Sequence, residues 1–199
     1  MTQRSVDPSA EWQRQLPILI HRKVALREPN QADVHAIGEV LHSCDGARFG
    51  LEAGPSDETL PGIIERWAAD RANGSRITFA VLVETDLVGL IQIRPLHPRF
   101  ESAEWDMALA PDHRGTGIFF DAAHLAISFV FGTLGTNRLE ARVAANNGRA
   151  MGAMRKLGAV QEGVLRRAIR QGDQYADQAL WALLNDDWWH RRVIEPRVH

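Results

Sequence analysis

One stretch of this sequence decides the fold: Glu104–Phe131, which is EWDMALAPDHRGTGIFFDAAHLAISFVF. Its opening residues alternate polar and apolar side chains, a pattern that is typical of a half-buried strand. The run from Ile118 to Phe131 is largely apolar and predicts a helix. Pro111 ends the strand, and the glycine loop, Arg114-Gly115-Thr116-Gly117, joins the strand to the helix.

The glycine loop is suited to hold a phosphate group. A helix start presents unpaired backbone N–H groups and the positive end of the helix dipole, and glycine lets a ligand approach the backbone closely. A P-loop would need Gly-Lys-Ser/Thr where this chain has Gly117-Ile118-Phe119. A dinucleotide fingerprint would need a third glycine at Phe120. The arginine before the glycines instead favours another kind of pyrophosphate-containing cofactor.

The composition is that of an ordinary globular domain. The chain has 199 residues, of which 45% are hydrophobic and 24% charged, which suits one domain with a sizeable core. Its formal net charge of −2 gives no reason to expect nucleic-acid binding. Cys44 is the only cysteine, so no intrachain disulfide can form, and we expect a reducing, cytoplasmic location.

The sequence gives no sign of a membrane segment or a metal site. No apolar run approaches the roughly 20 residues that span a bilayer. Residues 1–15 are too polar for a signal peptide. We interpret residues 1–17 as a flexible N-terminal extension and residues 18–192 as the single domain. The eight histidines show no metal-ligand spacing, so no metal is expected.

Hydrophobic periodicity predicts a mixed α/β order, β-α-α-β-β-β-α-β-α-β-β. Strands are expected at residues 23–27, 77–84, 87–94, 104–109, 138–143, 160–170 and 175–184. Helices are expected at residues 31–43, from 56 or 57 to 72, at 118–131, at 146–157 and, as a short last element, at 185–192. Turn residues separate these elements, among them Asn73-Gly74 and Gly172-Asp173.

This order, with the glycine loop after the fourth strand, resembles the GNAT superfamily of acetyl-CoA-dependent N-acyltransferases, over about Ile18 to Trp189. The pyrophosphate signature of that family, Gln/Arg-x-x-Gly-x-Gly/Ala, matches at Arg114 and Gly117. Phe119 replaces the small last residue, so its side chain must point away from the phosphates. The resemblance implies an α/β fold with a central, mostly antiparallel mixed sheet of splayed strands, flanked by helices.

Further segments are similar to the RimJ/RimL type, which includes ribosomal-protein N-terminal acetyltransferases. They correspond to its opening "LRP…D" segment, its "N-x-x-S…KLGF" helix, its "eGvlR" strand and its C-terminal "D…W" pattern. In this chain they are Val24–Glu28 with Asp33, Asn147 with Lys156–Ala159, Gly163–Arg166, and Asp177 with Asp187-Trp188. Their order and spacing together favour this subfamily.

The resemblance also implies which residues bind acetyl-CoA or another short acyl-CoA. The pantetheine arm is expected along the fourth strand, where a backbone N–H faces the thioester oxygen, at Met107, Ala108 and Leu109. The pyrophosphate is expected at the glycine loop and the helix start: Arg114, Gly115, Thr116, Gly117, Ile118 and Phe119. Asn147 is expected to reach the pantetheine arm, and it can also cap its own helix.

Glu104 and Asp106 are the candidate general bases. They lie two positions apart on a strand and so share one face. If that face borders the substrate cleft, either can take the proton of the acceptor amine, directly or through water. The alternative is a solvated strand face. An α-amine with a pKa of about 8 needs less help than a lysine side chain at about 10.4, so a weak base suits an N-terminal substrate.

The general acid has no evident candidate. The family often places a tyrosine where this chain has Met154, and the RimJ/RimL type often has a serine where it has Ala150. Neither side chain can donate a proton. Tyr175, the only tyrosine, is predicted on the final hairpin. Protonation of the thiolate by water, a slow enzyme, or a chain that does not acetylate amines all remain open at this point.

The acceptor side is expected near Asp45–Pro55, where the family builds its acceptor loop. Arg48 can meet an acidic group of the acceptor, although a solvated arginine is the simpler interpretation. Phe49, Trp67 and Trp105 can line the acceptor pocket, with core packing as the alternative for Trp67.

The sequence thus predicts an N-acyltransferase that moves an acyl group from acetyl-CoA directly to a primary amine, without an acyl-enzyme. The acceptor is a protein N-terminus or a small molecule, and neither a nucleic acid nor a membrane is expected as a partner. A homodimer is possible, with Trp188-Trp189 packing the last element or a dimer face. The alternative is a catalytically weak acyl-CoA-binding regulatory module, which Ala150, Met154 and Phe119 would explain.

Overall fold

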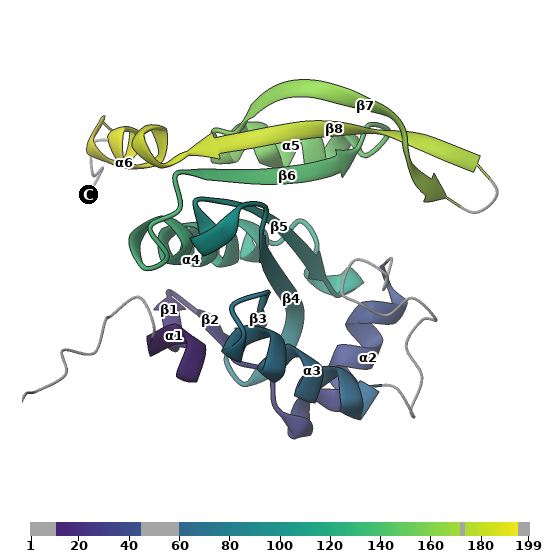
Figure 1. Ribbon diagram of the computed structural model, residues 1–199. Helices are drawn as coiled ribbons and strands as arrows, with labels where there is room; N and C mark the ends of the chain where they lie inside the picture. The colour runs from purple at the N-terminus through teal and green to yellow at the C-terminus, as the bar shows by residue number, and fades with distance from the viewer. Residues whose placement is uncertain (1–10, 45–59, 172–173, 195–199) are drawn as a thin grey trace, which may run out of the picture.

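The described part of the chain, residues 11–44, 60–171 and 174–194, folds around one eight-stranded sheet in the computed structural model (Figure 1). In sheet order, the strands are β1 (Leu19–His21), β2 (Val24–Arg27), β3 (Ile77–Val83), β4 (Asp86–Pro95), β5 (Ser102–Leu109), β6 (Arg138–Ala144), β8 (Gln174–Leu184) and β7 (Val160–Gln171). Neighbouring strands are antiparallel except β5 and β6, which run parallel. The predicted α/β fold with a mixed, mostly antiparallel sheet is therefore confirmed.

The helices also follow the predicted order. They are α1 (Glu11–Arg14), α2 (Val34–His42), α3 (Leu60–Ala72), α4 (Ile118–Gly132), α5 (Gly148–Leu157) and α6 (Asn185–Ile194). Short 3-10 turns precede α2, β5 and α4, at residues 31–33, 98–100 and 111–113. The sequence did not predict α1 or β1, because each is too short for a periodic pattern. In the described ranges, no helix is long and apolar enough to cross a membrane.

Helices cover both faces of the sheet. α4 and α5 belong to a core cluster that includes Trp105 and Leu109 of β5, whereas α2 and α3 pack in a second cluster that includes Ala108. Successive side chains of a strand point to opposite faces, so the odd-numbered residues of β5 face α4 and the even-numbered ones face α2. Glu104 and Asp106 therefore share the α2 face, as the sequence predicted.

Residues 11–17, which the sequence assigns to a flexible extension, lie against the core instead. The Trp12 side chain is 7% exposed and meets Phe100 edge to face, with 5.5 Å between the ring centroids. Leu16 is also buried, and the Arg71 guanidinium donates a hydrogen bond to the carbonyl of Gln13. The domain therefore includes residue 11 onward, because burial of these apolar side chains holds the segment in place. Residues 1–10 lie outside the described residues.

A partly buried ion pair fixes the connection from β2 to α2. The Arg27 guanidinium donates to both carboxylate oxygens of Asp33, at 2.7 Å each. The N–H of Asn30 donates to the same carboxylate, and the Asn30 side chain accepts from the N–H of Ala32. Burial raises the pKa of Asp33, but the hydrogen bonds from Arg27 and Asn30 lower it by more, so the pKa lies below its ordinary value.

Asp33→Asn is expected to lower the free energy of unfolding by about 2 kcal/mol at pH 7, because it leaves the Arg27 guanidinium without its charged partner. A carboxyl with a lowered pKa stabilises the fold above its unfolded pKa of about 3.9, and this stabilisation is lost as the pH falls through the folded value. The difference between wild type and variant should therefore shrink in acid. Urea denaturation across pH measures it. Asp86→Asn, exposed at the first residue of β4, is the control, and an equal loss in both variants would contradict the assignment.

Candidate functional site

The two parallel strands of the sheet form a fork. β5 and β6 pair only at Ser102–Glu104 with Arg138–Glu140. Beyond these positions β5 stays paired with β4 as far as Leu109, and β6 stays paired with β8 as far as Ala144. Each strand keeps its outer partner while the pairing between β5 and β6 ends, so the two strands separate. A cavity of about 1020 Å³, here called the fork cavity, opens at this separation.

Glu104 marks the point where the fork opens. It is the last residue of β5 that pairs with β6, and it is only 4% exposed. Its Oε2 accepts a hydrogen bond from Nη2 of Arg94 at 2.7 Å and lies 3.8 Å from Nε of Arg142. The carboxylate thus links β4, β5 and β6. Glu104 is not among the residues that line the fork cavity, so of the two candidate bases only Asp106 borders it.

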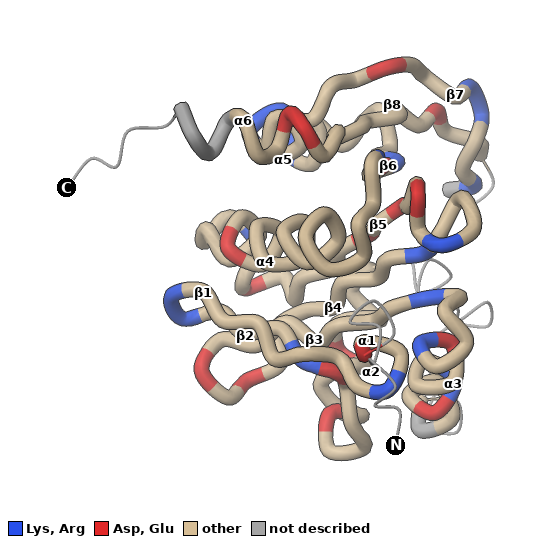
Figure 2. The backbone as a smooth tube through the Cα atoms, turned by 60° about the vertical axis from the view of Figure 1, so that its left-hand side comes forward, with Lys and Arg blue, Asp and Glu red and all other residues tan. Residues whose placement is uncertain are grey.

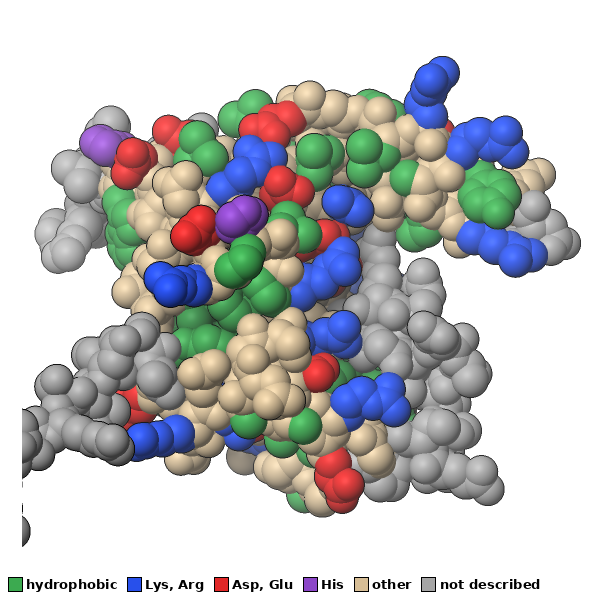
Figure 3. Space-filling view, in the orientation of Figure 1, with side chains coloured by type: hydrophobic (Ala, Val, Ile, Leu, Met, Phe, Trp, Pro, Cys, Tyr) green, Lys and Arg blue, Asp and Glu red, His purple; other side chains and the backbone are tan. Residues whose placement is uncertain are grey.

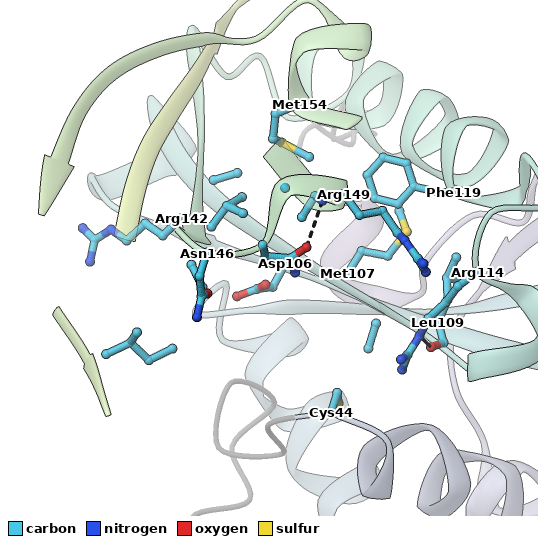
Figure 4. A pocket seen from close by; sticks show the side chains of 18 of the residues that line it. Cys44, Asp106, Met107, Leu109, Arg114, Phe119, Arg142, Asn146, Arg149 and Met154 are labelled. Atoms are coloured by element: carbon cyan, nitrogen blue, oxygen red, sulfur yellow. Dashed lines mark hydrogen bonds between the residues drawn. The ribbon is translucent and has the colours of Figure 1, made fainter. Parts of the chain in front are cut away.

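Several parts of the fold line the fork cavity (Figure 4). The outer half of β5, Trp105–Leu109, forms one wall, and residues 141–144 of β6 form another. The start of α5 and the end of α2, with Ser43 and Cys44, contribute the rest, together with two residues of β7. The lining includes these residues that the sequence assigned to acyl-CoA: Met107, Ala108, Leu109, Arg114, Phe119 and Asn147.

Alternate backbone groups of β5 point into the fork. The N–H of Ala110 donates to the carbonyl of Val88 at 2.8 Å, and β5 pairs with β4 without a register shift. Backbone groups of consecutive strand residues point to opposite edges of the strand. Ala108 therefore faces β4, whereas Met107 and Leu109 face the gap toward β6. Of the three residues expected to bind the pantetheine arm through their backbone, only Met107 and Leu109 are therefore oriented to do so.

The glycine loop has a backbone that glycine adopts most easily. φ is +85° at Gly115 and +91° at Gly117, both in the left-handed region. At either position, no described heavy atom outside the neighbouring residues lies within 4 Å of the place of a Cβ, so the loop is open above both glycines. The N–H of Phe120 donates to the carbonyl of Gly117 at 2.9 Å and closes the first turn of α4 over the buried Ile118. This open helix start is the geometry of an anion site.

Arg114 ties the glycine loop to two other elements. Its Nε donates to the carbonyl of Leu109 at 2.9 Å, and its Nη2 donates to the carbonyl and the hydroxyl of Ser43 at 3.1 and 3.0 Å. Within the loop, the Thr116 hydroxyl donates to the carbonyl of His113 at 2.8 Å. The sequence predicted Arg114 beside a phosphate but gave no sign of its contact with Ser43, which is 71 positions away.

Phe119 packs toward the sheet. Its ring centroid lies 6.3 Å from that of Trp105 on β5 and 5.3 Å from that of Phe120. The side chain is half-buried and forms part of the cavity wall (Figure 4). It leaves open the space above Gly115 and Gly117, so a large residue at this position is compatible with a ligand at the loop.

The positions expected to supply a general acid offer no proton donor. Oδ1 of Asn147 accepts from the N–H of Ala150 at 3.0 Å and caps α5. Ala150 and the buried Met154 line the cavity with apolar groups. Tyr175 is 58% exposed, packs on the Arg167 guanidinium and does not line the cavity.

Arginines dominate the charge of the fork cavity. The described lining contains four arginines and one carboxylate: Arg114, Arg142, Arg149 and Arg170 against Asp106. Sequence analysis missed three of these arginines, because they lie on three different elements and no motif joins them. Among the residues that the structure describes, no group of three or more His, Cys, Asp or Glu is placed to hold a metal ion.

Two of the aromatic residues expected at the acceptor side, Trp67 and Trp105, lie in different parts of the structure. Trp105 lines the fork cavity, whereas Trp67 is buried in the core cluster under α2 and α3. Trp67 therefore packs the core, which was the alternative interpretation. Arg48, Phe49 and the rest of the expected acceptor loop lie outside the described residues.

Comparison with known proteins places the chain among acetyltransferases. The model of the acetyltransferase (GNAT) domain family matches residues 23–160. The uncharacterized N-acetyltransferase YoaA of Bacillus subtilis (strain 168) is 26% identical over 171 residues, which cover 84% of this chain and 97% of YoaA. The spermidine N(1)-acetyltransferase of Vibrio cholerae serotype O1 is 25% identical over 108 residues, which cover 54% of this chain and 62% of that enzyme.

A solved structure shares the fold. Mycobacterium smegmatis RimJ in complex with CoA-disulfide superposes with a TM-score of 0.72 over 85% of this chain and 88% of that chain. The two sequences are 22% identical, so the likeness concerns the fold. It agrees with the GNAT fold predicted from the glycine loop and the order of elements.

Arg114→Met is expected to speed hydrogen exchange at the end of α2 about fivefold, because it removes bonds to Ser43 worth about 1 kcal/mol in total. Exchange in a peptide that covers residues 40–44, followed by mass spectrometry, measures the effect. Arg99→Met, which removes an exposed arginine outside the cavity lining, is the control. Equal exchange in wild type and Arg114→Met would show that these bonds do not hold the helix end.

Proposed function

This chain belongs to the acetyltransferase (GNAT) domain family, and on that basis we propose that it transfers an acetyl group from acetyl-CoA directly to a primary amine. One observation carries most of the support: the fork between β5 and β6 opens beside the glycine loop at the start of α4. A cofactor with a pyrophosphate and a long amide-containing arm needs both an anion site and an open strand edge.

The edge of β5 that faces the fork is the site we propose for the pantetheine arm. Met107 and Leu109 point their backbone groups into the gap, and the Leu109 carbonyl already accepts from Arg114. Met107 is therefore the position best placed to pair with the arm as an added strand would. A backbone N–H here is the candidate donor to the thioester oxygen, where negative charge develops during attack.

The glycine loop and the start of α4 are the site we propose for the pyrophosphate. Its residues are Arg114, Gly115, Thr116, Gly117, Ile118 and Phe119. The left-handed glycines and the helix start present backbone N–H groups together, and Arg114 adds a positive charge at the border of the cavity. Asn147 caps α5 and lines the same cavity, so both of its expected roles are compatible.

Asp106 is the general base that we propose. It lines the fork cavity, whereas Glu104 is buried against Arg94. The acceptor ammonium loses a proton to Asp106, directly or through water. Its nitrogen then forms a bond to the acetyl carbon while the carbon–sulfur bond breaks and the coenzyme leaves as a thiolate. The nitrogen gives its second proton to water, and water protonates the thiolate, so the products are the neutral amide and the free thiol of the coenzyme. No acyl-enzyme forms in this scheme.

We also propose the RimJ/RimL type, a cytoplasmic location, a protein N-terminus or a small molecule as the acceptor, and a homodimer. The likeness to RimJ supports the type, and the similarity to a spermidine N(1)-acetyltransferase supports an amine as the acceptor. For a dimer the support is Trp189 on α6, which is 38% exposed next to the buried Trp188.

A catalytically weak acyl-CoA-binding regulatory module is the second candidate. The observation that favours it is the cavity wall at Ala150 and Met154, which lacks a proton donor at both expected positions. Turnover separates the two candidates. Tight binding of acetyl-CoA without acetylation of any amine would favour the module.

Gly117→Ala is expected to weaken acetyl-CoA binding at least about tenfold, since a φ of +91° strains an alanine and moves the N–H groups of the loop. Isothermal titration calorimetry measures this change. Gly135→Ala is a matched control, because φ is +69° there and its Cβ would also enter open space, but at the other end of α4. Equal losses in both variants, or none in either, would count against a pyrophosphate site at the loop.

Asp106→Asn is expected to lower kcat about 100-fold while leaving the Kd for acetyl-CoA unchanged, because it removes the base without touching the glycine loop. Steady-state kinetics and calorimetry on the same preparations separate the two effects. Asp187→Asn, exposed on α6, is the control for the loss of one carboxylate. An unchanged kcat would show that another group, or water alone, takes the proton.

A further inference from the structure

Gly89 lets two neighbouring strands approach each other closely beside the fork cavity. It lies on β4 and pairs with Leu109 of β5. A Cβ at this position would lie 2.5 Å from the carbonyl oxygen of Ala108 and 2.6 Å from Cδ2 of Leu109. Non-bonded carbon atoms pack at about 3.5–4.0 Å, so a side chain here requires one of the strands to move. φ at Gly89 is not in the left-handed region, so glycine is needed for space alone.

A hydrogen bond also holds the end of β5 to β4. The N–H of Ala110 donates to the carbonyl of Val88 at 2.8 Å, which makes these two residues a hydrogen-bonded pair. In an antiparallel ladder the next pair, Gly89 with Leu109, is then a non-hydrogen-bonded pair, in which side chains approach most closely. The missing side chain at Gly89 and the bond from Ala110 to Val88 therefore keep the end of β5 close to β4.

The fork is the direction in which β5 can yield. Ala108 belongs to the buried cluster of α2 and α3, and Leu109 belongs to the buried cluster of α4, so both faces of the strand are packed. On its far edge β4 is paired with β3, where Gly89 lies opposite Val81. β5 lies between β4 and β6 (Figure 2), and its edge toward β6 is unpaired beyond Glu104. A side chain at position 89 would therefore push β5 into the fork.

The fork cavity gives room for this movement. The surface is hollowed beneath the outer part of the β7–β8 hairpin, on the side where the fork opens (Figure 3). Ala108 and Leu109, the two residues that a Cβ at Gly89 would meet, both line the cavity, whereas Gly89 is not part of the described lining. The backbone groups of Met107 and Leu109 face the gap, so a displaced β5 carries them out of their present positions.

Resting on the proposed acetyl transfer, we infer that Gly89 is a positioning residue for the pantetheine arm of acetyl-CoA. By letting β5 lie close to β4, it fixes the place of the backbone groups of Met107 and Leu109. N–H···O hydrogen bonds span about 2.7–3.2 Å, so even a small displacement of β5 weakens its pairing with the arm. The turn at residues 111–113 separates β5 from the glycine loop, which should hold the pyrophosphate as before.

The experiment compares two ligands, acetyl-CoA and 3′-phospho-ADP, by isothermal titration calorimetry. The second ligand is the part of the coenzyme that ends at the pyrophosphate and lacks the pantetheine arm. Gly89→Ala is expected to weaken binding of acetyl-CoA at least about tenfold and that of 3′-phospho-ADP less than about twofold. A loss of stability alone would not separate the two ligands, because both bind the same folded state.

Hydrogen exchange gives a second readout in the wild type and in Gly89→Ala. Acetyl-CoA, but not 3′-phospho-ADP, should slow exchange in a peptide that covers residues 102–110, because the arm covers N–H groups of β5 that face the fork. In Gly89→Ala most of this protection should be lost, even at acetyl-CoA concentrations that saturate the variant.

Ala110→Pro perturbs the same contact from the other strand. φ at Ala110 is −54°, which proline adopts, and the proline ring replaces the N–H that faces the carbonyl of Val88. We expect the same selective loss of acetyl-CoA binding. This variant carries the test if Gly89→Ala does not fold.

Gly38→Ala is the matched control. A Cβ at Gly38, which is buried on α2, would lie 2.9 Å from Cδ1 of Leu60, so this variant also adds a methyl group to a crowded site. The neighbouring atom is the end of a flexible side chain and not the backbone of a strand. Gly38→Ala should therefore bind both ligands as the wild type does.

Two results would overturn the positioning role and leave acetyl transfer standing. One is unchanged binding of acetyl-CoA in Gly89→Ala and Ala110→Pro. The other is an equal loss of acetyl-CoA and 3′-phospho-ADP, because the change then reaches the pyrophosphate site as well. A wild type that binds neither ligand, or that binds 3′-phospho-ADP as tightly as acetyl-CoA, would instead contradict the proposed cofactor site itself.

Discussion

The short parallel pairing of β5 with β6 is the constraint on which the rest of the site depends. The two strands share only three residue positions, while β4 and β8 hold their outer edges to the end. Beyond Glu104 the two strands diverge, and their unpaired inner edges face a cavity instead of each other. Glu104 sits where the opening begins and binds Arg94 from one side with Arg142 close on the other. The ion-pair cluster around Glu104 thus lies at the same position as the end of the β5–β6 pairing.

The site has two sides, one on each side of the opening between β5 and β6. On one side the glycine loop and the start of α4 lie next to the unpaired edge of β5, so the proposed pyrophosphate site and a row of backbone groups are adjacent. Arg114 joins the loop to Leu109 and to Ser43, which connects the cofactor side with the end of α2. On the other side the β7–β8 hairpin extends past the fork and brings Arg170 to it.

The electrostatics of the cavity distinguish this protein from what family membership alone implies. GNAT membership accounts for a pyrophosphate site and an open strand edge, and neither requires arginines at the far end of the cavity. The fold supplies them from β6 and β7, around a single described carboxylate, Asp106.

The sequence by itself determined the order of elements, the glycine loop, the helix cap at Asn147 and the common face of Glu104 and Asp106, because each depends on local periodicity or on a short motif. Only the tertiary structure decided that Glu104 belongs to an ion-pair cluster while Asp106 borders the cavity. Glu104 and Asp106 look alike in the sequence, because both are acidic residues on one face of a strand. Their burial depends on strands that are distant in the chain. The same reason applies to Arg142, Arg170 and Ser43, which long-range pairing brings together, and to residues 11–17, whose two buried apolar side chains were too few to form a pattern.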